Sequence, residues 1–124
     1  MYVKDYLKQI KLLDIKINQR MMEKNDLEYI AIKYPGIQEH CEELAAGIEK
    51  VISDMVNQKD CIIGQIMQLK GYRYSDVLFL HYVKYMQLEE IAEWLVKSNG
   101  KGYTWNHINF VHGNALKELQ TLLQ

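Results

Sequence analysis

Apolar residues recur at every seventh position through the middle of this 124-residue chain, and that recurrence limits the folds that it can adopt. The register consists of Cys41, Ile48, Met55, Ile62 and Leu69. A seven-residue apolar repeat places its members along one side of an α-helix, where they can pack against a second helix. The register therefore predicts one long amphipathic helix that begins near Ile37, with Leu44 and Val51 widening its apolar side.

A second long helix is predicted ahead of this one, in residues 2–32, where the apolar positions also follow a heptad register. The sequence Tyr34-Pro35-Gly36 separates the two helices, because proline disfavours a helical residue before it and glycine tolerates turn conformations. Residues 1–71 are therefore predicted to form a helical arm. This arm either closes on itself as an antiparallel hairpin or pairs with a second chain in a homodimer.

Residues 72–124 are predicted to form three shorter helices instead of continuing the arm. A helix start signal precedes residues 76–85, and apolar spacings of three and four predict a helix at residues 88–96. The glycines and the asparagine within residues 97–103 predict a loop, and Thr104 is a favourable N-cap for the last helix. Strand-like alternation is absent from the sequence, so we expect an all-α fold.

The last of these helices is amphipathic. Its inward stripe is predicted to consist of Ile108, Val111, Ala115, Leu119 and Leu122. Its opposite side is predicted to carry Asn106, Phe110, Gly113 and Lys117. Three helices, of which the last two are joined by a glycine-containing turn, correspond to the helix-turn-helix plan.

Residues 88–95, Leu-Glu-Glu-Ile-Ala-Glu-Trp-Leu, resemble the first motif helix in region four of sigma factors. Residues 104–119 resemble the recognition helix of that region, including its Ala-Leu-x-x-Leu ending at residues 115–119. Residues 77–83 resemble the helix that precedes the motif. The resemblance covers about residues 75–122. With the helical arm ahead of it, the layout is similar to that of small sigma-like regulators carried by phages and prophages of Gram-positive bacteria.

This resemblance implies a function as well as a fold. It implies a sequence-specific DNA-binding transcription regulator of the phage or prophage late-gene type. The partner that it implies is duplex DNA at a promoter or operator, with RNA polymerase as a second partner. No cofactor is needed for such a role.

Candidate DNA contacts lie on the last helix and around its start. The candidates for reading base edges are polar and aromatic side chains of its first turns, Asn106, His107, Asn109 and Phe110. The candidates for phosphate contacts are three lysines and the helix cap, Lys97, Lys101, Lys117 and Thr104. Trp105 either stacks on a base or packs against a neighbouring helix. In the alternative interpretation, the asparagines only solvate a helix face and Phe110 packs on a neighbour or a second subunit.

The charge distribution keeps a second hypothesis open. Fifteen Lys and Arg stand against sixteen Asp and Glu, a formal net charge of −1, whereas many nucleic-acid binders carry a basic excess. The first 24 residues hold six of the positive charges, and the acidic residues concentrate at 39–54 and 89–93. The alternative is a protein-interaction module that contacts RNA polymerase or a sigma factor without reading DNA.

No enzymatic, metal or membrane function is expected. The sequence has no phosphate-binding glycine loop, no paired nucleophile and base, and no zinc pattern, so we expect neither catalysis nor a cofactor. His107 and His112 stand five residues apart, which points them to different sides of a helix and disfavours a metal site. No apolar run approaches the about 18 residues that span a bilayer, and no secretion signal is apparent, so a cytoplasmic location is expected. Cys41 and Cys61, about 30 Å apart on one helix, could not pair with each other.

Overall fold

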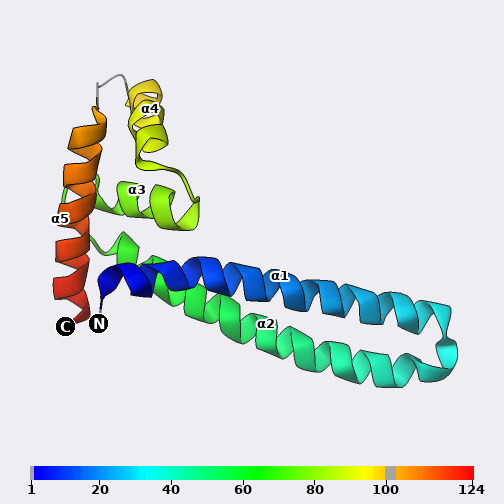
Figure 1. Ribbon diagram of the computed structural model, residues 1–124. Helices are drawn as coiled ribbons and strands as arrows, with labels where there is room; N and C mark the ends of the chain where they lie inside the picture. Colours follow the sequence, from blue (N-terminus) through cyan, green and yellow to red (C-terminus); the bar gives the residue numbers. More distant parts are fainter. Residues whose placement is uncertain (1, 100–102) are drawn as a thin grey trace. The chain divides into compact units, whose positions relative to one another are not determined.

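The computed structural model describes residues 2–99 and 103–124, and for residues 97–99 it describes the backbone without the side chains. Within these ranges every element is a helix and no strand occurs, which confirms the all-α prediction. The elements are α1 (Val3–Lys33), a 3₁₀ turn η1 (Pro35–Ile37), α2 (Gln38–Met67), α3 (Tyr74–Leu78), a π-helical turn η2 (Phe79–Val83), α4 (Leu88–Asn99) and α5 (Trp105–Leu123), as Figure 1 shows. None of the helices in the described part of the chain is long and apolar enough to cross a membrane.

The helices predicted at residues 76–85 and 88–96 have other bounds in the structure. The first is divided into α3, which ends at Leu78, and the π-helical turn η2, which ends at Val83, two residues before the predicted end. α3 begins at Tyr74, two residues early, because Arg73 ahead of it takes a left-handed conformation with φ of 67° and turns the chain there. α4 continues to Asn99, so the loop predicted for residues 97–103 starts too early and Lys97 lies in a helix. Lysine, serine and asparagine can all extend a helix, and Gly100 is the first strong helix breaker after α4 begins.

Contacts between residues divide the chain into two compact units. The hairpin unit comprises residues 12–60, and the C-terminal unit comprises residues 1–11 together with residues 61–124. The sequence pattern places a boundary at residues 71–72 instead, because it follows a change in apolar spacing and not the contacts between distant residues.

In the hairpin unit, α1 and α2 run antiparallel and are joined through η1 (Figure 1). Leu13, Cys41 and Met55 are buried in this unit. An ion pair of 2.7 Å between Lys59 Nζ and Asp14 Oδ1 also connects the two helices. The hairpin, one of the two arrangements predicted for the arm, is therefore present within a single chain.

The apolar side of α2 is covered only in part. Leu44 and Val51 were expected to widen the packed stripe, but they are 47% and 46% exposed. Two helices bury only the strip along which they meet, so apolar residues at the edge of that strip stay in contact with solvent. Cys41 and Cys61 are both free thiols, as predicted.

In the C-terminal unit, α3, α4 and α5 pack around one core. This core consists of Val77, Ile91, Ala92, Leu95, Ile108 and Val111. The inward stripe predicted for α5 is confirmed as far as Leu119, since Ala115 and Leu119 are also fully buried. The prediction is wrong for Leu122, which is 43% exposed, because little of the chain packs against the last turn of the helix.

One carboxylate fixes the connection between α2 and α3 to the last helix. Glu118 Oε2 accepts hydrogen bonds from the backbone N–H groups of Lys70, at 3.0 Å, and Gly71, at 3.5 Å. In the same unit, the hydroxyl of Tyr6 donates to Oε1 of Gln65 and joins the start of the chain to the end of α2. Side-chain hydrogen bonds thus connect segments of the C-terminal unit that lie far apart in the sequence.

Replacement of Gly71 by alanine should destabilise the protein. A Cβ at this position would overlap the ring of Tyr74, so the turn between α2 and α3 would have to shift. We expect a loss of about 1–3 kcal/mol in the free energy of unfolding, measured by urea denaturation. Gly64→Ala is the matched control, because a Cβ there meets no atom within 4 Å. The control should keep stability or raise it by about 0.5–1 kcal/mol, and an equal loss in both variants would contradict the proposed clash.

Candidate nucleic-acid interface

The side of α5 that faces away from the core is open to solvent. We call this side the outer face of α5, and it consists of Asn106, Phe110, Gly113 and Lys117. Asn106 and Lys117 are exposed, Phe110 is 67% exposed and Gly113 is half-buried. Asn109 is also exposed, next to this face. Three of the four predicted base-reading side chains, Asn106, Asn109 and Phe110, are therefore not used in packing.

Thr104 caps the start of α5, as its residue type predicts. Its backbone is extended, with φ of −85° and ψ of 160°, and its Oγ1 accepts the N–H of His107 at 3.1 Å. A capped helix N-terminus concentrates backbone N–H groups and the positive end of the helix dipole, which favours a nearby anion such as phosphate. The cap thus fixes the place at which a phosphate would meet α5.

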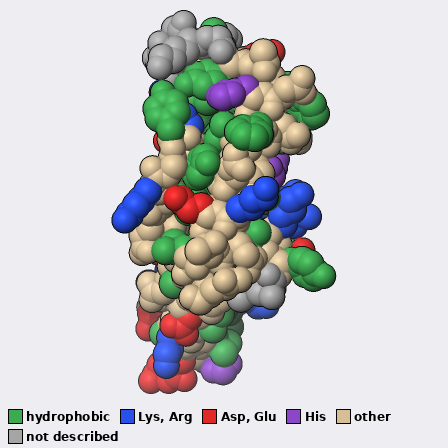
Figure 2. All heavy atoms as spheres, turned by 90° about the vertical axis from the view of Figure 1, so that its left-hand side faces the viewer, with side chains coloured by type: hydrophobic (Ala, Val, Ile, Leu, Met, Phe, Trp, Pro, Cys, Tyr) green, Lys and Arg blue, Asp and Glu red, His purple; other side chains and the backbone are tan. Residues whose placement is uncertain are grey.

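Trp105 and His107 lie apart from the outer face. Trp105 is 46% exposed and lines a groove of about 410 Å³ between α4 and the start of α5. His107 is exposed, and its ring lies 5.3 Å from the ring of Tyr103. Figure 2 shows hydrophobic side chains and a histidine gathered near the start of α5. Trp105 is thus partly packed against α4 and partly exposed, so its position is compatible with both predicted roles, packing against a neighbouring helix and stacking on a base.

The groove beside Trp105 has an acidic wall. Glu89 and Glu93, one turn apart on α4, line it together with Ala92 and Val96. Carboxylates at this place repel phosphate and attract a basic group. The third acidic residue of α4, Glu90, has a structural role, because its Oε1 accepts the N–H of Gln87 at 3.2 Å and so caps the helix start.

The structure describes the three predicted phosphate-binding lysines to different extents. Lys117 is exposed on the outer face of α5. Lys97 lies in the last turn of α4, where its side chain is not described, and Lys101 lies outside the described residues.

A cluster around Arg73, which the sequence did not single out, supports the start of α5. Arg73 Nη1 donates to Oδ2 of Asp76 at 2.9 Å, and the guanidinium lies 5.2 Å from the ring centre of Tyr72. The hydroxyls of Tyr72 and Tyr103 are 3.4 Å apart. Asp76 and the two tyrosine hydroxyls raise the pKa of Arg73 above its usual value. Residues that precede α3 thereby hold Tyr103, which lies just before the cap of α5.

A buried histidine lies on the inner side of α5. His112 is 7% exposed, and its Nε2 is 2.9 Å from the hydroxyl of Tyr82. Burial, with added repulsion from the charges of His81 and Lys4, lowers the pKa of His112 to about 4. Burial also raises the pKa of Tyr82 to about 12. Within the described residues, no group of three His, Cys, Asp or Glu side chains could hold a metal ion.

Comparisons with known proteins give no family to which the chain can be assigned. Neither the protein-family models, nor the curated proteins, nor the solved structures contain a match to it. The resemblance to region four of sigma factors thus depends on the residues quoted above. The features of the protein that bear on its function are the outer face of α5 and the groove beside Trp105.

The burial of His112 predicts a loss of stability in weak acid. Its pKa falls from the usual 6.5 to about 4 in the folded protein, so between these pH values the unfolded chain takes up a proton that the folded chain refuses. The contribution of neutral His112 to the free energy of unfolding is fully present above pH 6.5 and declines as the pH falls toward 4. Between about pH 7.5 and about pH 5, the free energy of unfolding should fall by about 2 kcal/mol, measured with urea.

His112→Gln isolates this effect. Glutamine can keep a hydrogen bond to Tyr82 but does not titrate, so the variant should lose that part of the pH dependence. His40 and His107 are present in both proteins and cancel in the comparison. His81, whose charge acts on His112, is controlled by repeating the comparison in a His81→Gln background. If wild type and variant lose the same stability on acidification, His112 is not the residue responsible.

Proposed function

We propose that this protein is a sequence-specific DNA-binding transcription regulator of the sigma-like kind found in phages and prophages. The observation that carries the proposal is the open outer face of α5. The inner side of this helix closes the core of the C-terminal unit, with Ile108 and Ala115 fully buried, and the outer side carries polar and aromatic groups that no packing requires. In helix-turn-helix proteins this second helix enters the major groove.

Each exposed group has a matching partner on duplex DNA. Asn106 and Asn109 can each form a bidentate pair with adenine, in which the amide N–H donates to N7 and the amide oxygen accepts from the N6 amino group, and Phe110 can contact a thymine methyl. Lys117 and the capped N-terminus of α5 suit phosphate oxygens. Lys97 and Lys101, the other two lysines predicted to contact phosphate, would add to these contacts. Promoter DNA and RNA polymerase would then be the partners of a cytoplasmic protein.

The charge of the C-terminal unit also supports the proposal. This unit holds nine of the fifteen Lys and Arg residues and six of the sixteen Asp and Glu residues, a formal charge of +3. The hairpin unit holds the other six basic and ten acidic residues, a formal charge of −4. The total of −1 therefore hides a basic unit, which is the unit that contains α5.

One observation favours the alternative role in protein binding. Glu89 and Glu93 make an acidic wall in the groove that Trp105 lines. An apolar floor with a carboxylate edge suits a basic side chain of a protein such as RNA polymerase or a sigma factor. In this alternative the fold of a DNA reader serves contact with the transcription machinery.

Binding to duplex DNA should weaken steeply as salt is added. Three phosphate contacts, from Lys97, Lys101 and Lys117, predict a loss of about 40-fold in affinity between about 50 mM and about 200 mM salt. Fluorescence anisotropy with a labelled mixed-sequence duplex measures this loss. Lys117→Gln should reduce the slope of log affinity against log salt by about 1, whereas the control Lys50→Gln in the hairpin unit should not change it. Absence of binding at the lower salt concentration would refute the proposal.

Base reading can be separated from general binding by changing the two asparagines. A preferred site is first selected from random duplexes with the wild-type protein. Asn106→Ala with Asn109→Ala should weaken binding to that site by about tenfold or more while binding to random duplexes changes little. Equal losses on both kinds of duplex would mean that these residues do not read bases.

Glu89→Gln with Glu93→Gln distinguishes the two functions. Removal of two carboxylates near the start of α5 should strengthen binding to duplex DNA if this unit meets DNA. If the groove instead binds a basic partner, the same variant should lose retention on purified RNA polymerase and gain nothing on DNA.

A further inference from the structure

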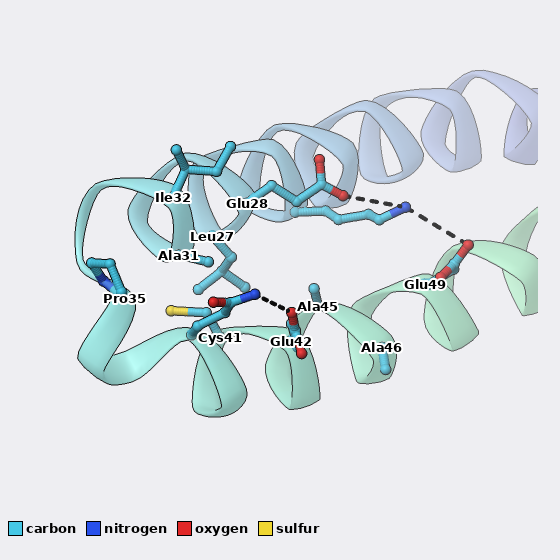
Figure 3. Close-up of a pocket in the computed structure, with 12 residues that line it drawn as sticks. Leu27, Glu28, Ala31, Ile32, Pro35, Cys41, Glu42, Ala45, Ala46 and Glu49 are labelled. Atoms are coloured by element: carbon cyan, nitrogen blue, oxygen red, sulfur yellow. Dashed lines mark hydrogen bonds and ion pairs between the residues drawn. The ribbon is translucent and has the colours of Figure 1, made fainter.

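A groove of about 590 Å³ lies between α1 and α2, near the turn of the hairpin unit. Leu27 and Ala31 of α1 and Cys41 and Ala45 of α2 point toward one another across it (Figure 3). Alanine side chains are too short to fill the space between two helices, whereas Met55 fills the seam farther along. The groove thus follows from the placement of small residues at facing positions.

The edge of this groove is acidic. It carries Glu28, Glu42 and Glu49, and one lysine, Lys24. Lys24 Nζ lies 3.8 Å from a carboxylate oxygen of Glu28 and 3.7 Å from one of Glu49, so a single ammonium serves two carboxylates. Glu42 Oε1 accepts a hydrogen bond of 2.9 Å from the neutral amide of Gln38 (Figure 3). The edge therefore keeps an excess of negative charge.

The surroundings of the groove reinforce this character. Residues 24–49, the range that the lining residues span, contain six acidic residues and two lysines, a formal charge of −4. Ile32, which lines the groove, is 81% exposed. An exposed apolar strip with a negatively charged border is suited to an occupant that is apolar on one side and basic around it.

We propose that this groove binds a basic amphipathic helix of a partner protein. The helix lies along α1 and α2, inserts an apolar side chain between Ala31 and Ala45, and places Lys or Arg side chains against the acidic edge. Binding of this kind completes a three-helix packing that the hairpin alone leaves open. The inference is independent of DNA binding, because all the lining residues belong to the hairpin unit.

A second copy of this chain is a poorer fit to the groove. The chain has its own basic helical segment, since six of its positive charges fall in the first 24 residues. The seam of that segment is already committed, with Leu7 and Ile10 fully buried and Leu13 8% exposed, whereas Leu12 and Ile15 beside the seam are 58% and 46% exposed. The segment could insert its seam residues into the groove of another copy only by unpacking from its own fold, so a second copy is an outcome that the sedimentation test below distinguishes.

A synthetic helix tests the chemistry of the occupant. The probe is a labelled peptide of about 18 residues, made of leucine and lysine at helical spacing and titrated with the full-length protein in a fluorescence anisotropy experiment. A matched leucine–glutamate peptide should bind at least about tenfold more weakly. Equal binding of the two peptides would overturn the proposal.

Two variants test the site. Ala45→Trp fills the groove, and the triple change Glu28→Gln, Glu42→Gln and Glu49→Gln neutralises its edge without altering side-chain size. Each should weaken binding of the leucine–lysine peptide by about tenfold. The triple variant keeps the test valid if the tryptophan disturbs folding, because the three glutamates are exposed.

A matched control removes the same number of charges elsewhere in the hairpin unit. Glu23→Gln, Asp54→Asn and Asp60→Asn together change acidic residues that do not line the groove. This control should alter peptide binding by no more than about twofold. A loss as large as that of the groove variant would show general attraction to an acidic surface and overturn the proposal.

A thiol gives a second measure of occupancy. Ala46 lines the groove and is exposed, whereas Cys41 is 4% exposed, so the variant Cys41→Ser, Cys61→Ser, Ala46→Cys carries its only thiol at an accessible place in the groove. Saturation with the leucine–lysine peptide should slow the reaction of that thiol with a thiol reagent, and an unchanged rate with peptide bound contradicts binding in the groove. Sedimentation supplies the remaining test, because a wild-type dimer that Ala45→Trp converts to a monomer would identify the occupant as a second copy.

Discussion

The buried stripe of α5 is the contact on which the rest of the C-terminal unit depends. Ile108 and Leu119, eleven residues apart, have no exposed surface, so this side of the helix is committed to the core along three turns. An α-helix at the edge of a core buries only one side, and the opposite side is exposed whatever residues it carries. Packing therefore imposes no requirement for an asparagine at 106 or a phenylalanine at 110. Exposed residues that the fold does not demand are available for a binding function, and the proposed DNA contacts lie among them.

The same constraint has a different result in the hairpin unit. Two helices can share only one strip, and α2 is apolar over a wider arc than α1 can cover, which leaves Leu44 and Val51 about half exposed. Where the facing residues are alanines, at 31 and 45, even the shared strip is not filled. A third helix packed along α1 and α2 can cover such a surface. The low burial of this unit is thus better understood as an open packing site than as a poorly formed core.

Local signals allowed much of the fold to be predicted from the sequence. Pro35 ends α1 and Thr104 caps α5, and both effects are decided within a few residues. Features that depend on distant partners could not be predicted. His112 is buried because Tyr82, thirty positions earlier, supplies a hydrogen bond, and no spacing rule within one helix contains that information. The left-handed conformation of Arg73 and the groove between the two long helices belong to the same class, since tertiary contacts create them.

Charge illustrates why the units have to be considered separately. A formal net charge of −1 argues weakly against nucleic-acid binding when it is assigned to the whole chain, yet it is the sum of +3 in the C-terminal unit and −4 in the hairpin unit. A polyanion such as DNA attracts the first unit and repels the second. The two proposed partners, duplex DNA for the C-terminal unit and a basic helix for the hairpin unit, have opposite charges. Each proposed partner is therefore attracted to the unit that is proposed to bind it.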